Sequence, residues 1–149
     1  MQAEMPHLVA DLIRGAPPEE LSARPAPGKW SIVEIIAHLA EDELTGTWRY
    51  RQMIESPGTS LPGFDQDLWA RLGDYAAWSA KDALDMFRLL REANLRMLRG
   101  LTERQFDAGG VHAERGEMTV RSLARHMAGH DRNHLEQIRR ILQPKKFSR

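Results

Sequence analysis

Apolar side chains recur at the three- and four-residue intervals of an α-helix in four stretches of this chain. Prolines and glycines separate the stretches, and no segment shows the convincing alternation of a β-strand. Helices with one apolar face must bury that face against each other. The pattern therefore predicts an all-α fold, a four-helix bundle that forms a single domain over residues 1–149. The expected helices run from Met5 to Arg14, from Ser31 to about Glu55, from Ser79 to about Leu101, and from about Thr119 to just before Pro144.

The second expected helix has the clearest start signal and is followed by a long connection. Ser31 and Glu34 have the spacing of a capping box, in which each side chain bonds the other residue's backbone N–H. Residues 56–78 then connect it to the third helix, with one short helix expected from about Asp67 to Leu72. Such long connections often lie over functional sites. A surface crossover anchored by two tryptophans explains this segment equally well. The last connection, with Gly109, Gly110 and Gly116, is expected to be rich in turns.

Composition excludes several classes of function. Lys and Arg together number 21, as do Asp and Glu, so the formal net charge is zero and we expect no nucleic-acid partner. No apolar run approaches the roughly 20 residues that span a bilayer, and the N-terminal residues lack the basic start of a signal peptide, so we expect no membrane association and a cytoplasmic location. The chain has no cysteine, which excludes disulfides, cysteine metal ligands and a cysteine nucleophile. Any thiol chemistry needs a thiol from outside.

Three histidines stand at four-residue spacing in the last expected helix, at positions 126, 130 and 134. Neighbours in this row have β-carbons roughly 5–6 Å apart. That separation lets two imidazoles bind one metal ion, because zinc–nitrogen bonds are about 2.0–2.1 Å long. The outer pair, His126 and His134, lie about 12 Å apart along the helix axis and cannot share an ion. The helix therefore supplies at most two ligands, and a third must come from elsewhere.

The orientation of each histidine selects the candidate ligands. At about 100° per residue, His134 lies about 40° from the apolar position Val120, His130 about 80° and His126 about 120°. His130 and His134 thus belong to the inner face and its shoulder, while His126 is expected at the surface. His38 stands on the border of the apolar stripe of the second helix, with Asp42 one turn later, and is the natural third ligand. His7 and His112, on the short first helix and in a glycine-bounded loop, are not excluded.

One other interpretation of these histidines stays open, as side chains without a metal, whereas a zinc-protease motif and a di-iron site both fail. A histidine at a helix border is usually hydrogen-bonded or solvated, and pairs four residues apart arise by chance on polar faces. The string from His130 to His134 resembles the zinc-protease motif H-E-x-x-H, but no convincing third ligand follows it. A di-iron site needs a second Glu-x-x-His-like motif and further glutamates, which the chain lacks.

Polar and aromatic residues near the predicted site have alternative roles. Asp131 and Glu43 fall on expected inner faces, where a carboxylate needs a partner. Each either orients a histidine N–H or forms an interior salt bridge, with the salt bridge slightly favoured. Four further residues are candidates for lining a pocket at the mouth of the bundle, although the sequence assigns them no role: Trp48, Arg49, Trp69 and Trp78.

Three segments together resemble the DinB-like superfamily of metal-binding four-helix bundles, which includes YfiT-type proteins and bacillithiol- or mycothiol-dependent transferases. They are ARPAPGKWSIVEIIAHLAEDE (23–43), LREANLRMLRGLTERQFD (90–107) and LARHMAGHDRNHLEQIRRIL (123–142). The resemblance implies that His38, His130 and His134 bind zinc or nickel, the same three residues that orientation selects. It also implies a homodimer, and activities that transfer groups with a low-molecular-weight thiol. It implies no contact with DNA.

The leading functional hypothesis is a metal-dependent transferase that acts on a small molecule with such a thiol. Three histidine ligands plus an exchangeable position are typical of catalytic zinc. Two alternatives remain. One is a metal-dependent hydrolase that uses metal-bound hydroxide, and the other is a non-enzymatic, metal-stabilised bundle that acts in stress or in protein interactions. The catalytic residues and the substrate are not predicted.

Overall fold

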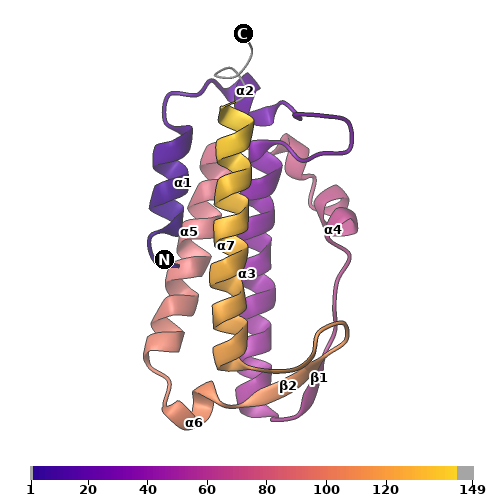
Figure 1. Cartoon of the computed structure of the whole chain (residues 1–149), viewed down its shortest axis with the longest axis vertical. Coiled ribbons are helices and arrows are strands. Elements are labelled where there is room, and N and C mark those ends of the chain that lie inside the picture. Colours follow the sequence, from indigo (N-terminus) through magenta and orange to yellow (C-terminus); the bar gives the residue numbers. More distant parts are fainter. Residues whose placement is uncertain (1, 144–149) are drawn as a thin grey trace.

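Four long helices form the body of the molecule in the computed structural model, which describes residues 2–143 (Figure 1). They are α1 (Met5–Ile13), α3 (Ile32–Glu55), α5 (Ala80–Arg99) and α7 (Val120–Leu142). Each matches one of the four predicted stretches to within a few residues, and Pro144, the expected stop, lies outside the described residues. The predicted bundle is confirmed. No helix among residues 2–143 combines the length and the apolar character needed to cross a membrane.

Capping boxes fix the starts of α3 and α7, the two helices that carry the three predicted metal ligands. Ser31 Oγ accepts a hydrogen bond from the N–H of Glu34 at 3.2 Å, and the N–H of Ser31 donates to Glu34 Oε2 at 2.8 Å. This is the pair that the sequence predicts. At the start of α7, Thr119 and Ser122 bond each other in the same reciprocal way. Because these bonds satisfy N–H groups that have no partner within the helix, they define where each helix begins.

The long connection lets α5 run in the same direction as α3 (Figure 1). Residues 56–78 leave one end of the bundle and return to the other beside α3, which is the long crossover that a parallel neighbour requires. The segment contains β1 (Thr59–Leu61), α4 (Gln66–Leu72) and the 3₁₀ helix η1 (Tyr75–Ala77). The predicted short helix over 67–72 is therefore confirmed as α4.

A small sheet closes the lower end of the bundle in Figure 1, and the expectation of an all-α fold without strands is wrong in this detail. Strand β1 pairs in parallel with β2 (Gly109–His112), which pairs antiparallel with β3 (Gly116–Thr119). These strands are too short to show an alternating pattern, and two glycines begin β2. A Cβ at Gly110 would lie 2.9 Å from the Thr59 carbonyl oxygen, so the close pairing of β1 with β2 needs this glycine.

Two short helices also escape the sequence pattern, α2 (Pro18–Ser22) and α6 (Glu103–Phe106), because neither is long enough to show a helical period. The core consists of two apolar clusters. One joins α1, α3, α5 and the C-terminal half of α7. The other joins the end of α3 and the start of α7 to the sheet. His130 and His134 lie on the stretch of α7 between Met127 of the second cluster and Leu135 of the first.

Candidate metal centre

Three histidine side chains from two helices converge between α3 and α7. The Nε2 atom of His130 lies 3.2 Å from Nε2 of His38 and 3.1 Å from Nε2 of His134. One ring nitrogen from each of the three histidines lies within 4.8 Å of the other two, and within residues 2–143 this is the one cluster of side chains found that could hold a metal ion. The structure thus brings together the three histidines that the sequence selects.

The arrangement fits a tetrahedral metal ion. Zinc–nitrogen bonds of about 2.0–2.1 Å at tetrahedral angles place two ligand nitrogens about 3.3 Å apart, close to the two separations observed. Hydrogen bonding alone does not satisfy the cluster, because a proton on His130 Nε2 can serve only one of its two neighbours. A cation between the three lone pairs resolves this conflict.

Residues around the cluster set the orientation of two rings. His134 Nδ1 lies 2.9 Å from Gln137 Oε1. Because an amide oxygen only accepts, the proton of neutral His134 sits on Nδ1 and Nε2 keeps its lone pair for a metal. His130 Nδ1 is buried and without a hydrogen-bond partner, and the carboxylate of Asp42 is 3.6 Å from it. The ring of Trp30 packs on His38 at a centroid distance of 5.0 Å.

Burial keeps all three histidines neutral. Desolvation lowers the pKa of His38 from 6.5 to about 4, against an opposing effect of the Asp42 charge. Desolvation also lowers the pKa of His130, which Asp42 opposes, and the pKa of His134, where proximity to His130 adds to the effect. Metal binding requires neutral imidazole. The protein therefore presents three neutral imidazoles at pH 7, the charge state that metal binding needs.

Metal occupancy is expected to fall as the pH is lowered from about 6.5 to about 4. The unfolded chain takes up protons on histidine near pH 6.5, whereas folded His38 does so only near pH 4. Lowering the pH from 6.5 towards 4 therefore favours first the unfolded, metal-free chain and then the protonated site. Dialysis at a series of pH values, followed by metal analysis, should show full occupancy at pH 7 and loss before pH 4. Unchanged occupancy at pH 4 would contradict these ligands.

Gln137 is a residue that the sequence reasoning missed, although it follows His134 by three residues on the same helix face. Gln137→Leu removes the acceptor that fixes the tautomer of His134. We expect metal affinity to fall by about 10–100-fold, the usual cost of losing such a partner. Competition titration with a chromogenic chelator measures this change. Gln137→Glu keeps an acceptor and should retain most of the affinity, so equal losses in both variants would argue against the orienting role.

The other histidines lie outside the cluster. His126 is exposed, as its orientation predicts, and its ring lies 6.4 Å from that of His130. His7 is exposed on α1. His112 is buried on β2, where its Nδ1 accepts hydrogen bonds from the N–H groups of Glu114 and Arg115 in the hairpin turn.

Glu43 and Asp131 each form an interior salt bridge with Arg91, which decides between the two roles left open by the sequence. Arg91 of α5 bonds Asp131 through two nitrogens, at 2.7 and 2.9 Å, and Glu43 through Nε at 2.9 Å. Asn94 donates to Glu43 Oε2 at 2.8 Å. All four side chains are buried. The carboxylate of Asp42 is instead the one that lies beside a histidine of the cluster, 3.6 Å from His130 Nδ1.

The four residues predicted as candidates for lining a pocket do not all line the same one. Trp48, Arg49 and Trp69 line one pocket between α3 and the segment that leads into α4. Trp78 lines a separate hollow, and its Nε1 donates to the Gly73 carbonyl at 2.8 Å. The sequence identified Trp48, Arg49 and Trp69 as candidates, but it did not show that the segment with α4 folds against α3.

Known proteins are similar to this chain in sequence and in fold. Residues 2–138 match the model of the DinB superfamily. OB0413 of Oceanobacillus iheyensis is 30% identical over 81% of this chain and 69% of its own length. OB0782 of the same organism is 23% identical over 91% and 78%. Both are provisionally named metal-dependent hydrolases.

The solved structure of YfiT from Bacillus subtilis, described as having an unusual four-helix bundle topology, superposes with a TM-score of 0.89. The match covers 99% of this chain and 85% of YfiT at 19% identity, which shows the fold. The resemblance seen in the three sequence segments is thereby confirmed. Because the family model spans nearly all of its length, the chain belongs to the DinB superfamily.

Proposed function

We propose that this protein is a metal-dependent enzyme whose divalent ion, zinc or nickel, is held by His38, His130 and His134. The observation that carries the proposal is the convergence of three Nε2 atoms from α3 and α7, with two contacts of 3.1 and 3.2 Å. Three protein ligands leave a fourth position for an exchangeable group, which is the arrangement of catalytic zinc. A bound ion would supply a Lewis acid that lowers the pKa of a nucleophile in that position.

The side chains around the site hold the ligands in place and limit the access of water. Gln137 holds the ring of His134 through Nδ1. Trp30 covers His38, which is only 2% exposed. His130 and His134 are half-buried and form the accessible side of the site. We therefore expect a substrate to reach the ion on the side of His130 and His134, and not on the side of His38.

The first candidate reaction is the transfer of a group to or from a low-molecular-weight thiol of the bacillithiol or mycothiol type, with a second small molecule as substrate. Two observations support it. The resemblance within the superfamily points to thiol transfer. The chain also contains no cysteine, so no internal thiol competes for the metal. The nucleophile in this reaction is the thiolate of the external thiol.

The second candidate is hydrolysis, with water as the nucleophile. It is supported by the names of OB0413 and OB0782, which class those relatives provisionally as metal-dependent hydrolases. The same three histidines serve either reaction, because both need a neutral ligand set and one open position. The candidates differ in whether a thiol binds.

A thermal-shift screen separates the candidates. Zinc-loaded and chelator-treated protein are each incubated with bacillithiol, mycothiol, glutathione or coenzyme A. A thiol at about 100 times its dissociation constant stabilises the protein by about 2.7 kcal/mol, which raises the melting temperature by several degrees. A rise that needs both metal and one thiol supports transfer. Metal-dependent cleavage of ester or amide substrates without thiol supports hydrolysis. If neither response is observed, the result supports a non-enzymatic, metal-stabilised bundle and overturns the proposal.

We also propose that the protein is a cytoplasmic homodimer that binds neither nucleic acid nor membranes. The dimer rests on the superfamily resemblance, and the other statements rest on the neutral charge and the absence of long apolar runs. Sedimentation equilibrium measures the mass directly. A value of 17.0 kDa, the mass of one chain, would contradict the dimer.

A further inference from the structure

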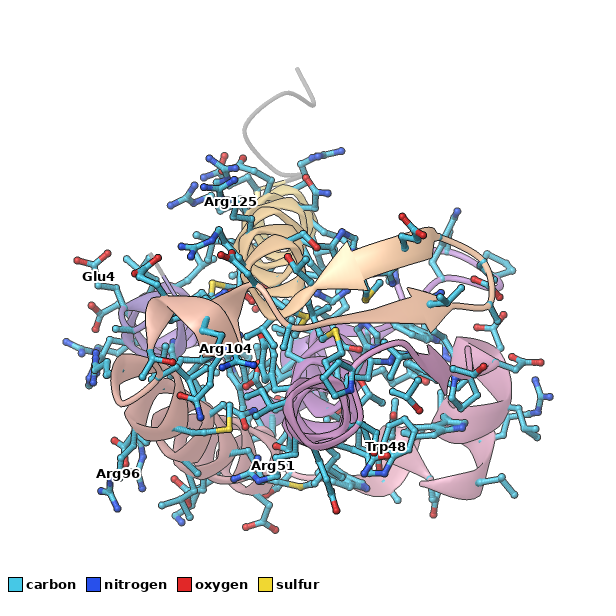
Figure 2. All side chains as sticks on the ribbon, turned by 90° about the horizontal axis from the view of Figure 1, so that it is seen from below. Glu4, Trp48, Arg51, Arg96, Arg104 and Arg125 are labelled. Atoms are coloured by element: carbon cyan, nitrogen blue, oxygen red, sulfur yellow. The ribbon has the colours of Figure 1, made fainter. Side chains whose placement is uncertain are left out.

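A small apolar pocket lies between α3 and the segment that leads into α4. Its volume is about 210 Å³, and its walls include Leu44, Trp48, Pro62, Phe64 and Trp69. The rings of Phe64 and Trp69 pack on each other at a centroid distance of 4.3 Å. Trp48 and Leu44 are 45% and 42% exposed, so an apolar rim faces solvent. Figure 2 shows Trp48 on the side of α3 that is turned towards α4.

One cation, Arg49, belongs to the wall of this pocket. Its guanidinium lies against two other wall residues, since Nη2 donates to the Pro62 carbonyl at 3.0 Å and Cζ is 5.8 Å from the centre of the Phe64 ring. The side chain is only 4% exposed. It is therefore a buried charge beside an apolar surface.

Arg49 has no carboxylate within 4.0 Å among residues 2–143, which sets it apart from the other buried arginine. Arg91 meets two carboxylates directly. Burial lowers the pKa of Arg49, and the charges of Asp42 and Glu114 oppose this effect from a greater distance while Arg115 adds to it. Buried arginines are almost always paired. The remaining guanidinium N–H groups of Arg49 are thus available for an anion.

We propose that this pocket binds a small aromatic carboxylate, with the carboxylate on Arg49 and the ring against Trp48, Phe64 and Trp69. Arginine binds carboxylates through two parallel, charge-assisted hydrogen bonds. The pocket is smaller than the roughly 300–1,000 Å³ of sites for drug-sized ligands, so it suits a molecule with a single ring. The aromatic walls give that ring an apolar contact surface. The site involves none of the metal ligands, so the binding requires no metal.

Calorimetric titration of the full chain with phenylacetate and its neutral analogue phenylacetamide tests the proposal, with and without zinc. Phenylacetate is expected to bind, and phenylacetamide to bind at least about tenfold more weakly, since charged hydrogen bonds contribute more than neutral ones. Arg49→Met keeps a long, unbranched side chain but removes the guanidinium. It should weaken the binding of phenylacetate by at least about tenfold. Arg51→Met is the matched control, because Arg51 is exposed on α3, bonds the Thr47 carbonyl and does not line the pocket. Figure 2 shows Arg51 on the side of α3 nearer α5.

Trp48→Ala gives a second test that does not depend on removing a buried group. Because this tryptophan is nearly half exposed, the variant should fold normally. The loss of a ring contact should weaken the binding of phenylacetate severalfold. The proposal is overturned if phenylacetate does not bind at millimolar concentration or if the amide binds equally well. It is also overturned if neither Arg49→Met nor Trp48→Ala reduces binding. Binding that is the same with and without zinc supports a site independent of the metal centre.

Discussion

His38→Ala is expected to abolish stoichiometric metal binding. The substitution removes the α3 ligand and leaves only His130 and His134, two nitrogens 3.1 Å apart on one helix. Loss of a partner that merely orients a ligand costs about 10–100-fold in affinity, so loss of the ligand itself should cost at least about a hundredfold. His130→Ala and His134→Ala should have the same effect. Equilibrium dialysis followed by elemental analysis gives the metal-to-protein ratio.

The matched control is His126→Ala. His126 lies one turn before His130 on α7 but is exposed and outside the cluster. This variant should bind one metal ion per chain as the unmodified protein does. Normal occupancy in His38→Ala, or an equal loss in His126→Ala, would show that the ion binds elsewhere. Circular dichroism of each variant distinguishes a lost ligand from a lost fold.

Arg91→Met should lower the free energy of unfolding by about 3–5 kcal/mol. The substitution leaves the carboxylates of Glu43 and Asp131 buried without their common cation. Asp131 is fully buried and Glu43 is 3% exposed, so neither can recover its hydration without local opening. Removing one partner of a buried ion pair typically has a cost of this size. Urea unfolding, monitored by circular dichroism, measures it.

Arg88→Met is the control for this effect. Arg88 lies one turn earlier on α5 and pairs with Glu92 at 3.5 Å, with both side chains substantially exposed. Exposed pairs contribute little, so the free energy of unfolding should change by no more than about 0.5 kcal/mol. A loss below about 1 kcal/mol in Arg91→Met would mean that water or a structural shift relieves the two carboxylates.

The sequence predicts the bundle and the three histidines because both depend on helical periodicity. His38 is identifiable as a third ligand because its position on the border of an apolar stripe fixes its direction relative to the next helix. The packing of α3 against α7 then turns that direction into a contact of 3.2 Å with His130. Superfamily resemblance points to the same residue by a separate route.

Features that depend on contacts between distant segments are not predictable in this way. The salt bridge between Arg91 and Asp131 joins residues 40 positions apart, and a polar residue on an otherwise apolar helix face does not reveal its partner. Strand β1 pairs with β2 across about 50 residues, and its three residues carry no readable alternation. The role of Gln137 depends on the rotamer of one side chain. In each case the missing information is tertiary geometry.

The most direct test of the metal centre is a crystal structure of the zinc-loaded protein with anomalous diffraction measured at the zinc edge. We predict one ion, bound by Nε2 of His38, His130 and His134 at about 2.0–2.1 Å. Its remaining ligand should be water or another small molecule. An anomalous peak away from these three nitrogens would contradict the site, and a fourth ligand from the protein itself would contradict its proposed role in catalysis.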